Sequence, residues 1–478
     1  MSKVSQQDAK KSIPKGKIIG AVLGLVIGVV VATLAPPGEL TKASMQGLGI
    51  LICAILFLIF KVLPDYLTVL MMCCAWAISK IVPANVAFSA FSGTTWWLLI
   101  SAFGIGYSIQ KTGLIYRIVY GVLNLFPKSF RGQVAGLLGS GVIIGPMLPS
   151  IVVKAAIFSP LTRGFSDAMG NKPKSKGAAA IFAVTWLGFC VLAPAIMSSN
   201  SQNFMAYAFL PDDLKAKFTF GYWMLAMLPW LVTMCVCTYI YAITVFKPEE
   251  EVVLPEGYCR EQLDKLGPMN RGEKVCIAVL LVAFILWVTE RAHGINSGMV
   301  AFASLLALIL FNVLDANDFK TKIPWDTLFF MGGVISIGSV ISNLGINNYV
   351  AELITPVLSG FTSNVYMFYL ALFLIACAIR FVVVSAAAFI TVFSALLVPF
   401  SVSVGLNPWP VLIVLLSANS ISILSYQNAM WLTALTGFRE DGLQPKHTLN
   451  IAIAYLIIVL IAIFASVPFW KFLGIVYM

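Results

Sequence analysis

The sequence predicts an all-α polytopic membrane protein with about eleven transmembrane helices and two re-entrant helical hairpins in an inverted repeat. Three observations predict this fold class. The first is composition: of 478 residues, 60% are hydrophobic and only 11% are charged, with a mean hydropathy of +0.93. A soluble domain of this size could not hide so much apolar surface. The second is a repeat within the chain, and the third is the gathering of basic residues in alternate loops.

The spans follow from apolar runs, because a helix needs about 20 consecutive apolar residues to cross the hydrocarbon core. The first 17 residues are polar and basic, and the apolar run behind them is of full span length. We therefore expect an uncleaved first helix and not a signal peptide. Apolar runs predict spans at about 17–36, 45–62, 64–82, 95–111, 177–210, 221–246, 273–290, 295–315, 324–344, 408–438 and 449–474.

Two further apolar stretches, about 131–161 and 363–404, are too long for one span and too interrupted for two. Each has a break that can form a turn, at Pro149-Ser150 and at Val384-Ser385. We interpret both stretches as re-entrant helical hairpins. Their non-helical tips are tolerated at membrane depth only where they are buried in protein or line a wet cavity.

The repeat relates the segment 96–210 to the segment 325–438. Each contains one of the hairpins and continues into an apolar helix that holds a polar cluster, Ser198–Asn203 in the first and Ser425–Asn428 in the second. Paired, interrupted membrane segments in matching positions are typical of secondary transporters, and they mark the site near the bilayer midplane. We therefore expect a transporter whose site draws on both segments.

The basic residues predict the topology, since Lys and Arg gather in cytoplasmic loops. With the N-terminus inside, the loops that fall inside hold most of the Lys and Arg, and the outside loops hold few. The first hairpin then enters from the cytoplasm and the second from outside, so that the two segments are inverted, and the C-terminus lies outside. The predicted inside loops are about 112–130, 162–176, 247–272, 316–323 and 439–448.

The sequence disfavours several other classes of protein. The net charge of +11 is explained by the inside loops, so we expect no nucleic-acid partner. The nine Cys are scattered without metal-ligand spacing, and His293 and His447 form no cluster. No catalytic triad, metal motif or nucleotide motif lies at a common depth, so we expect no enzyme, catalytic residue, metal or cofactor. An ion channel is disfavoured because inverted broken helices suit alternating access.

Four short blocks resemble one known family. They are Gln110–Leu114, Gly267–Lys274, Ile323–Leu328 and Ser425–Ala429, in the order that this family shows. The sequence resembles the divalent anion:sodium symporter (DASS) family, and within it the INDY-like bacterial dicarboxylate exchanger branch. The resemblance implies a carrier of dicarboxylates, tricarboxylates or sulfate in a bacterial cytoplasmic membrane. It also implies a homodimer whose scaffold and transport domains move as an elevator.

On this resemblance the chain divides into five parts. They are N-terminal scaffold helices at 1–94, a first repeat with hairpin and broken helix at 95–210, connecting scaffold helices at 211–323 with a cytoplasmic loop at 247–274, a second repeat at 324–438, and a C-terminal helix at 439–478.

The tips depart from the family pattern in a way that bears on coupling. Family symporters carry Ser-Asn-Thr at both tips, and the resemblance implies that these triplets build the substrate and sodium sites. Here the triplets are Ser150-Ile151-Val152 and Ser385-Ala386-Ala387, so both Asn and both Thr are replaced by apolar residues. The sequence therefore does not favour sodium coupling.

Two cations lie close to these tips, Lys154 four residues after Ser150 and Arg380 five residues before Ser385. We expect them to act as permanent surrogates for bound cations. An empty carrier would then hold net positive charge and resist crossing, whereas a loaded carrier would be charge-balanced, which gives obligatory exchange. The alternative is that each cation pairs with a backbone carbonyl or extends to the interface.

The polar clusters and tip hydroxyls supply the expected substrate-binding residues. A helix broken at the midplane exposes free N–H groups and a positive dipole end that suit carboxylates. The alternative is that these residues are ordinary interhelical hydrogen-bonding groups. The expected substrate-binding residues are Ser150, Ser199, Asn200, Ser201, Asn203, Ser385, Ser425, Gln427 and Asn428.

The sequence thus predicts sodium-independent antiport of C4–C5 dicarboxylates such as malate, succinate or 2-oxoglutarate. Symport of dicarboxylates or tricarboxylates with Na⁺ or H⁺ stays open as the alternative. The expected partners are the dicarboxylate substrates, membrane lipid and a second copy of the chain.

Overall fold

A computed structural model describes residues 15–347, 364–424, 427–439 and 442–478, together with the single residues 349, 352 and 356. Every element named within these ranges is a helix, as predicted. Seven of these helices are long and apolar enough to cross a membrane, or eight if a pair bent by 70° at Gly113 counts as one span. The prediction of about eleven spans stays a prediction, because several of the expected ranges hold shorter helices.

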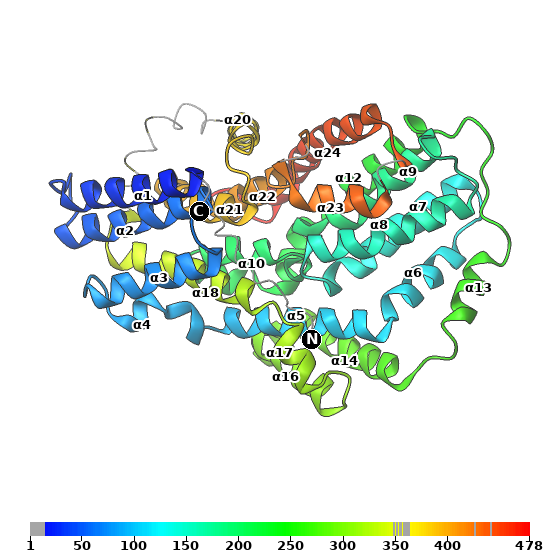
Figure 1. The fold of residues 1–478 in the computed structure, drawn as a ribbon, viewed down its shortest axis with the longest axis horizontal. Coiled ribbons are helices and arrows are strands. Elements are labelled where there is room, and N and C mark those ends of the chain that lie inside the picture. The colour runs from blue at the N-terminus through cyan, green and yellow to red at the C-terminus, as the bar shows by residue number, and fades with distance from the viewer. Residues whose placement is uncertain are drawn as a thin grey trace, which may run out of the picture.

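The first two helices, α1 (Lys15–Thr33) and α2 (Lys42–Ile59), pack against each other through glycine. A Cβ atom added to Gly28 would lie 2.8 Å from the carbonyl oxygen of Gly49, so the backbones approach as closely as they do because both positions lack a side chain. Most of the remaining surface of α1 is exposed and apolar. Figure 1 shows this pair side by side at one end of the long axis.

Two helices near the middle of the molecule make matching contacts. Helix α5 (Thr94–Thr112) packs on α16 (Ser297–Leu310), and α18 (Trp325–Asn343) packs on α3 (Asp65–Ile78). An added Cβ would lie 2.5 Å from Leu305 at Gly104 in α5 and 2.6 Å from Val69 at Gly333 in α18. Gly104 follows Trp96, and Gly333 follows Trp325, by the same number of residues. Each of these tryptophans opens one of the two repeated segments, 96–210 and 325–438.

Both stretches interpreted as hairpins are divided into two helices at the expected breaks. In the first, α7 (Phe130–Ile144) ends in a 3-10 turn (Gly145–Met147), and α8 (Ile151–Ala168) begins directly after Ser150. In the second, α20 (Val365–Ile379) is followed by α21 (Ala386–Ser403), which begins directly after Ser385.

The ranges 177–210 and 408–438, each expected as a broken helix with a polar cluster, are each two helices with a gap between them. The first runs from α9 (Lys176–Val184) through a π-helical turn (Thr185–Cys190) and two 3-10 turns to α10 (Ser201–Ala208). The second runs from α22 (Pro408–Ala418) to α23 (Ala429–Phe438). The described parts of both polar clusters lie in or beside these gaps.

The first gap exists because side chains replace helical hydrogen bonds there. Pro194 has no N–H to donate. The Asn203 amide donates instead to the carbonyl oxygens of Ala193 and Ile196, at 2.8 and 3.0 Å. We call the segment 191–200 the first gap and the segment 419–428 the second gap.

Elements of the two segments pack crosswise. Helix α8 lies against α23, and α10 lies against α21. Figure 1 shows α8 and α23 together near the middle of the molecule. An added Cβ on Gly141 in α7 would lie 2.1 Å from the carbonyl oxygen of Gly188 in the π-helical turn, so the first hairpin and the π-helical turn are packed without room between them.

The remaining helices connect these parts. The segment between α12 and α14 is held to the start of the first hairpin, since the Leu254 N–H donates to the Lys128 carbonyl at 2.9 Å. These helices are α4 (Ala84–Ala87), α6 (Leu114–Leu125), α11 (Asp212–Lys217), α12 (Phe220–Thr244), α13 (Tyr258–Lys265), α14 (Arg271–Val288), α15 (Glu290–His293), α17 (Ala316–Thr321) and α24 (Pro445–Phe472).

Candidate binding site

The first tip and the first gap are joined by hydrogen bonds. The backbone N–H of Ser201 donates to the Pro149 carbonyl at 2.9 Å, and the Ser198 hydroxyl donates to the Pro146 carbonyl at 2.8 Å. Ser150 is the N-cap of α8, and its hydroxyl oxygen accepts from the Val153 N–H at 3.3 Å. The polar cluster is therefore held directly beside the tip, as the sequence predicts for one site.

Lys154 is buried between these two segments, with 1% of its surface exposed. Its Nζ donates to the Ser199 carbonyl at 2.8 Å and to the Ser199 hydroxyl at 2.6 Å. No acidic side chain pairs with Lys154 in the part of the chain that the structure describes. Its positive charge is therefore solvated by dipoles and is not neutralised.

Arg380 holds the second tip in a related way and is also 1% exposed. Its Nη1 donates to the carbonyl oxygens of Val383 and Val384, at 2.6 and 2.8 Å, and its Nη2 donates to the Gln427 carbonyl at 2.9 Å. The guanidinium also lies 5.6 Å from the centre of the Phe389 ring. The forked side chain thus joins the second tip to the second gap.

Both cations therefore contact backbone carbonyl oxygens, which is one of the alternatives left open by the sequence. Carbonyl oxygens at a chain break are also the ligands that hard metal cations prefer. Each charged group thus occupies surroundings that would suit a metal ion.

Asparagine ends both gaps. Asn200 is the N-cap of α10, with its side-chain oxygen 3.4 Å from the Gln202 N–H. Asn428 is the N-cap of α23 and accepts from the Met430 and Trp431 N–H groups at 3.0 and 3.2 Å. Ser385 caps α21 as Ser150 caps α8, with the same 3.3 Å bond to the third residue on. These bonds use the side-chain oxygens as acceptors, so each serine hydroxyl keeps its proton for another partner.

A cavity of about 330 Å³ opens beside the first tip, and we call it the tip cavity. It brings together Ser150, Asn200 and Ser201 from the expected site. Of the side chains in the described part of the chain, Lys322 is the one charged group that lines it. The polar lining is completed by Tyr107 and Gln110 of α5, Gln202 of α10, and Thr327 of α18.

The other expected site residues lie outside this lining. Ser199 is engaged by Lys154, and Asn203 is fully buried with its amide bound to the first gap. The Gln427 carbonyl accepts from Arg380, while Ser385 and Asn428 cap α21 and α23. Ser425 lies outside the described residues. The structure thus brings part of the first-segment set into one cavity and leaves the second-segment set beside it.

Sequence reasoning missed Gln110, Gln202, Lys322 and Thr327 as lining residues. A signal was present for two of them, because Gln110 and Thr327 lie in the blocks that resemble the family. Those blocks end α5 and begin α18, and the two helix ends meet only in the folded chain. Lys322 directly precedes the block Ile323–Leu328, and the charge pattern places it only as a basic residue of the inside loop 316–323.

A hydrogen-bonded cluster holds Lys322 in place. Its N–H donates to the Asp318 carbonyl at 2.8 Å, and the Asp318 carboxylate pairs with Lys111 at the end of α5. Burial raises the pKa of Asp318, but the hydrogen bonds from Lys111, from the Asp315 N–H and from Tyr107, together with the charge of Lys111, outweigh it, so that the pKa lies below its usual value. The carboxylate therefore stays ionised at neutral pH, and the end of α5 stays joined to α17 and to Lys322.

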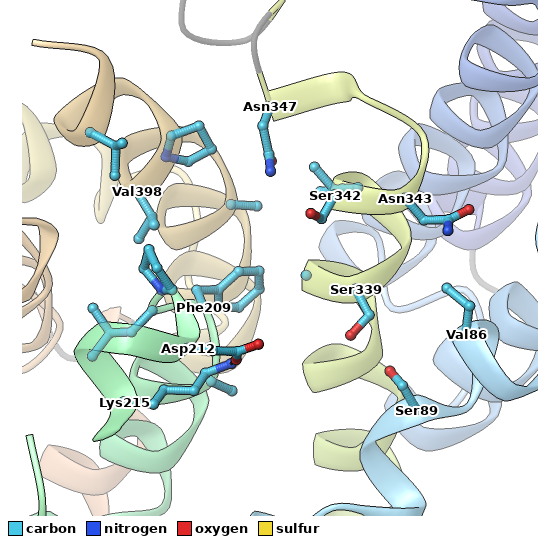
Figure 2. Close-up of a pocket in the computed structure, with 18 of the residues that line it drawn as sticks. Val86, Ser89, Phe209, Asp212, Lys215, Ser339, Ser342, Asn343, Asn347 and Val398 are labelled. Atoms are coloured by element: carbon cyan, nitrogen blue, oxygen red, sulfur yellow. The ribbon is translucent and has the colours of Figure 1, made fainter. Parts of the chain in front are cut away.

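A second cavity of about 820 Å³ lies at the other end of α18, and we call it the outer cavity because the charge pattern predicts that this end faces outside. Figure 2 shows Ser339, Ser342 and Asn347 on one side of it and Asp212 and Lys215 on the other. The two cavities lie at opposite ends of α18, and each is lined by elements from both segments.

The amino-acid sequence is similar to those of known proteins. Residues 15–476 match the family model described as the sodium:sulfate symporter transmembrane region. The chain is 27% identical over 325 residues to a spinach protein named dicarboxylate transporter 2, chloroplastic; the alignment covers 66% of this chain and 57% of the spinach protein. The chain therefore spans little more than half the length of that relative. It is 22% identical to the L-tartrate/succinate antiporter of Escherichia coli K12, over 70% of this chain and 69% of that protein.

The fold has a solved counterpart. The structure is similar to the crystal structure of the Alcanivorax borkumensis YdaH transporter, with a TM-score of 0.57, 13% sequence identity, and coverage of 96% of this chain and 97% of the other. At this identity the likeness concerns the fold alone. It agrees with an all-helical, polytopic membrane transporter.

Proposed function

The chain belongs to the sodium:sulfate symporter family of membrane transporters, the DASS family that its sequence blocks resemble, and on that premise we propose that it exchanges C4–C5 dicarboxylates without sodium. It is thus a transporter and not an enzyme. The names of two relatives, a dicarboxylate transporter and a tartrate/succinate antiporter, support the choice of substrate class and of exchange.

One observation carries the proposal. Lys154 donates to a carbonyl oxygen of the first gap, and Arg380 donates to a carbonyl oxygen of the second gap. Neither cation has an acidic partner among the described residues. In the proposed mechanism, the ammonium and guanidinium groups supply the positive charge that a bound metal cation would bring. The lost Asn and Thr of both tips agree with this reading, because their oxygens are no longer needed as ligands.

Exchange follows from the charge of the empty carrier. Insertion scales put the free-energy cost of one cation at membrane depth at about 2.5–3.5 kcal/mol. In an unloaded carrier this cost would apply to both Lys154 and Arg380. A bound dicarboxylate, with two negative charges, balances the two cations. The loaded carrier therefore crosses readily and the empty carrier does not, so transport in one direction requires substrate on the other side.

The movement we propose is an elevator. The hairpins and broken helices would form the transport unit, and the N-terminal and connecting helices would form the scaffold, with the boundaries given for the sequence. The crosswise packing of α8 on α23 and of α10 on α21 supports one unit built from both repeats. We place the N-terminus in the bacterial cytoplasm and the C-terminus outside, and we assign the exposed apolar face of α1 to a homodimer interface or to lipid.

The test is uptake of labelled malate into proteoliposomes. Four conditions are compared, with and without internal unlabelled dicarboxylate, each with and without a Na⁺ gradient. The proposal expects uptake that needs internal substrate and ignores Na⁺. Uptake into empty vesicles driven by Na⁺, or by a proton gradient imposed in a further condition, would instead establish the symport alternative.

A further inference from the structure

We propose that Lys322 binds one substrate carboxylate directly while the site faces the tip cavity, and that it thereby gives the carrier a higher affinity on that face than on the other. The inference rests on the proposed function, since it takes the substrate to be a dicarboxylate. By the charge pattern of the loops, the face concerned is the cytoplasmic one.

The first argument is charge. The tip cavity contains three expected substrate-binding residues, and Lys322 is the one charged side chain that lines it within the described ranges. Lys322 is exposed and has no ion-pair partner among the described residues. A dianion that enters the cavity therefore meets Lys322 before any other cation.

The second argument is the use of the buried cations. Lys154 has three N–H donors and already gives two hydrogen bonds to Ser199, and Arg380 binds three carbonyl oxygens. Neither side chain lines the tip cavity. The Nε of Arg380 has no partner in the described part of the chain, but because neither side chain lines the cavity, the direct contact with a carboxylate there is assigned to another group.

The third argument is position. Ser150, Asn200 and Ser201 belong to the first hairpin and broken helix, whereas Lys322 lies in the connecting part of the chain at 211–323. Through Asp318 it is tied to Lys111 of α5, a helix that is part of neither a hairpin nor a broken helix and that packs on α16 of the connecting part. In the proposed elevator these are different units. When the transport unit moves to the outer face, Ser150, Asn200 and Ser201 travel with it and Lys322 stays behind. The carboxylate contact of Lys322 then exists on one face only.

The chemistry favours a dicarboxylate over a monocarboxylate. One carboxylate can accept from the Ser150 hydroxyl and from the polar groups at the start of α10, while the second reaches the Lys322 ammonium. The Gln202 side-chain oxygen is buried, lines the cavity and has no hydrogen-bond partner in the described part of the chain. It is available as an acceptor for a substrate hydroxyl, such as that of malate.

The experiment measures transport from each face. Wild type, Lys322→Ala, Lys322→Arg and Lys320→Ala are reconstituted in proteoliposomes, and the orientation is fixed by blocking one population with an impermeant thiol reagent at a cysteine introduced for that purpose. Lys320 is the matched control, since it is an exposed lysine of α17, close in sequence to the exposed Lys322 that caps the end of this helix, but does not line the cavity. Initial rates of labelled malate exchange give KM separately for the two faces.

We expect Lys322→Ala to raise KM about tenfold at the cytoplasmic face, as the loss of one charge-assisted hydrogen bond predicts, and to leave the outer KM within about twofold. Lys322→Arg retains most of the affinity, and Lys320→Ala behaves as wild type. The preference for malate over a monocarboxylate falls at the cytoplasmic face alone.

Equal changes of KM on both faces, no change on either, or the same effect in Lys320→Ala would each overturn the inference. Lys322→Arg guards against misfolding, because it keeps the charge and nearly the same volume. Failure of wild type to exchange dicarboxylates at all would instead remove the proposed function, so the two failures are told apart by the wild-type arm.

Discussion

Each of the two tips is capped by a serine, but the cation that holds it differs. In the first tip the cation follows the serine in the sequence, and in the second it precedes the serine. Lys154 follows its tip and reaches only the first gap, where backbone and hydroxyl hydrogen bonds already join tip to gap. Arg380 precedes its tip and spans both the tip and the second gap. A compact ammonium suffices at the first tip, where other hydrogen bonds already connect the tip to the gap. A fork with separated donors is needed where the side chain makes the joint itself.

The largest effect that tests this difference is expected for Arg380→Met. It removes the donor from three carbonyl oxygens, a buried one at Gln427 and part-buried ones at Val383 and Val384, and a buried acceptor left without a partner costs about 1–3 kcal/mol. Exchange should fall more than about 100-fold, which corresponds to about 2.7 kcal/mol, and the midpoint of thermal unfolding should drop. Both are measured in the purified, reconstituted protein. Unchanged exchange in this variant would show that Arg380 neither joins the tip to the gap nor compensates charge.

A smaller loss, about tenfold, is expected for Lys154→Ala, because the backbone joint at the first tip remains. This variant also leaves a space surrounded by oxygen atoms of Ser199. If the ammonium stands in for a metal cation, Na⁺ should restore part of the exchange in Lys154→Ala and leave wild type unaffected, with choline as the control ion. Equal rates in Na⁺ and choline would argue that Lys154 has a purely structural role.

The matching glycines of α5 and α18 compare the two halves in their packing. Valine at Gly104 or at Gly333 would overlap Leu305 or Val69, and such overpacking costs about 1–3 kcal/mol. We expect similar drops in the unfolding midpoint for both variants, measured in detergent or nanodiscs. Gly121→Val is the control, since an added Cβ there meets nothing within 4 Å. A large drop for one glycine alone would mean that the two helix pairs are not equivalent.

The smallest effects come from the capping serines. Ser150→Ala and Ser385→Ala each lose an N-cap, which costs about 0.5–2 kcal/mol of stability. Only Ser150 lines the tip cavity, so only Ser150→Ala should also raise KM for the substrate, by a few-fold. The pair is compared by thermal unfolding and by exchange kinetics, and a KM effect of the same size at Ser385 would place the second tip in the binding site as well.

The sequence predicted the breaks of this fold better than its spans. Pro149-Ser150 is a local signal, because a residue without an N–H and a capping serine end one helix and start another within a few residues. At Val384-Ser385 the capping serine alone is the local signal. The first gap was foreseen as a break in a helix at a polar cluster, but its course was not. Its course depends on the hydrogen bonds of Asn203 to carbonyl groups up to ten residues earlier.

The tip cavity was predicted only in part, for a related reason. Ser150, Asn200 and Ser201 stood out as polar residues in apolar stretches. Gln110 and Lys322 lie at helix ends where polar residues are common, and what makes them notable is the meeting of α5 and α18 across more than two hundred residues. No periodicity or spacing along the chain encodes that meeting.

The Nζ of Lys154, fixed to Ser199 deep in the protein, has a consequence for regulation. A metal ion occupies its site according to its concentration, so a cell can raise or lower that occupancy. A group bonded to the chain has a local concentration that never varies. In the proposed mechanism a fixed group of this kind couples transport to no salt gradient, so the relative abundance of two anions would set the direction of flow.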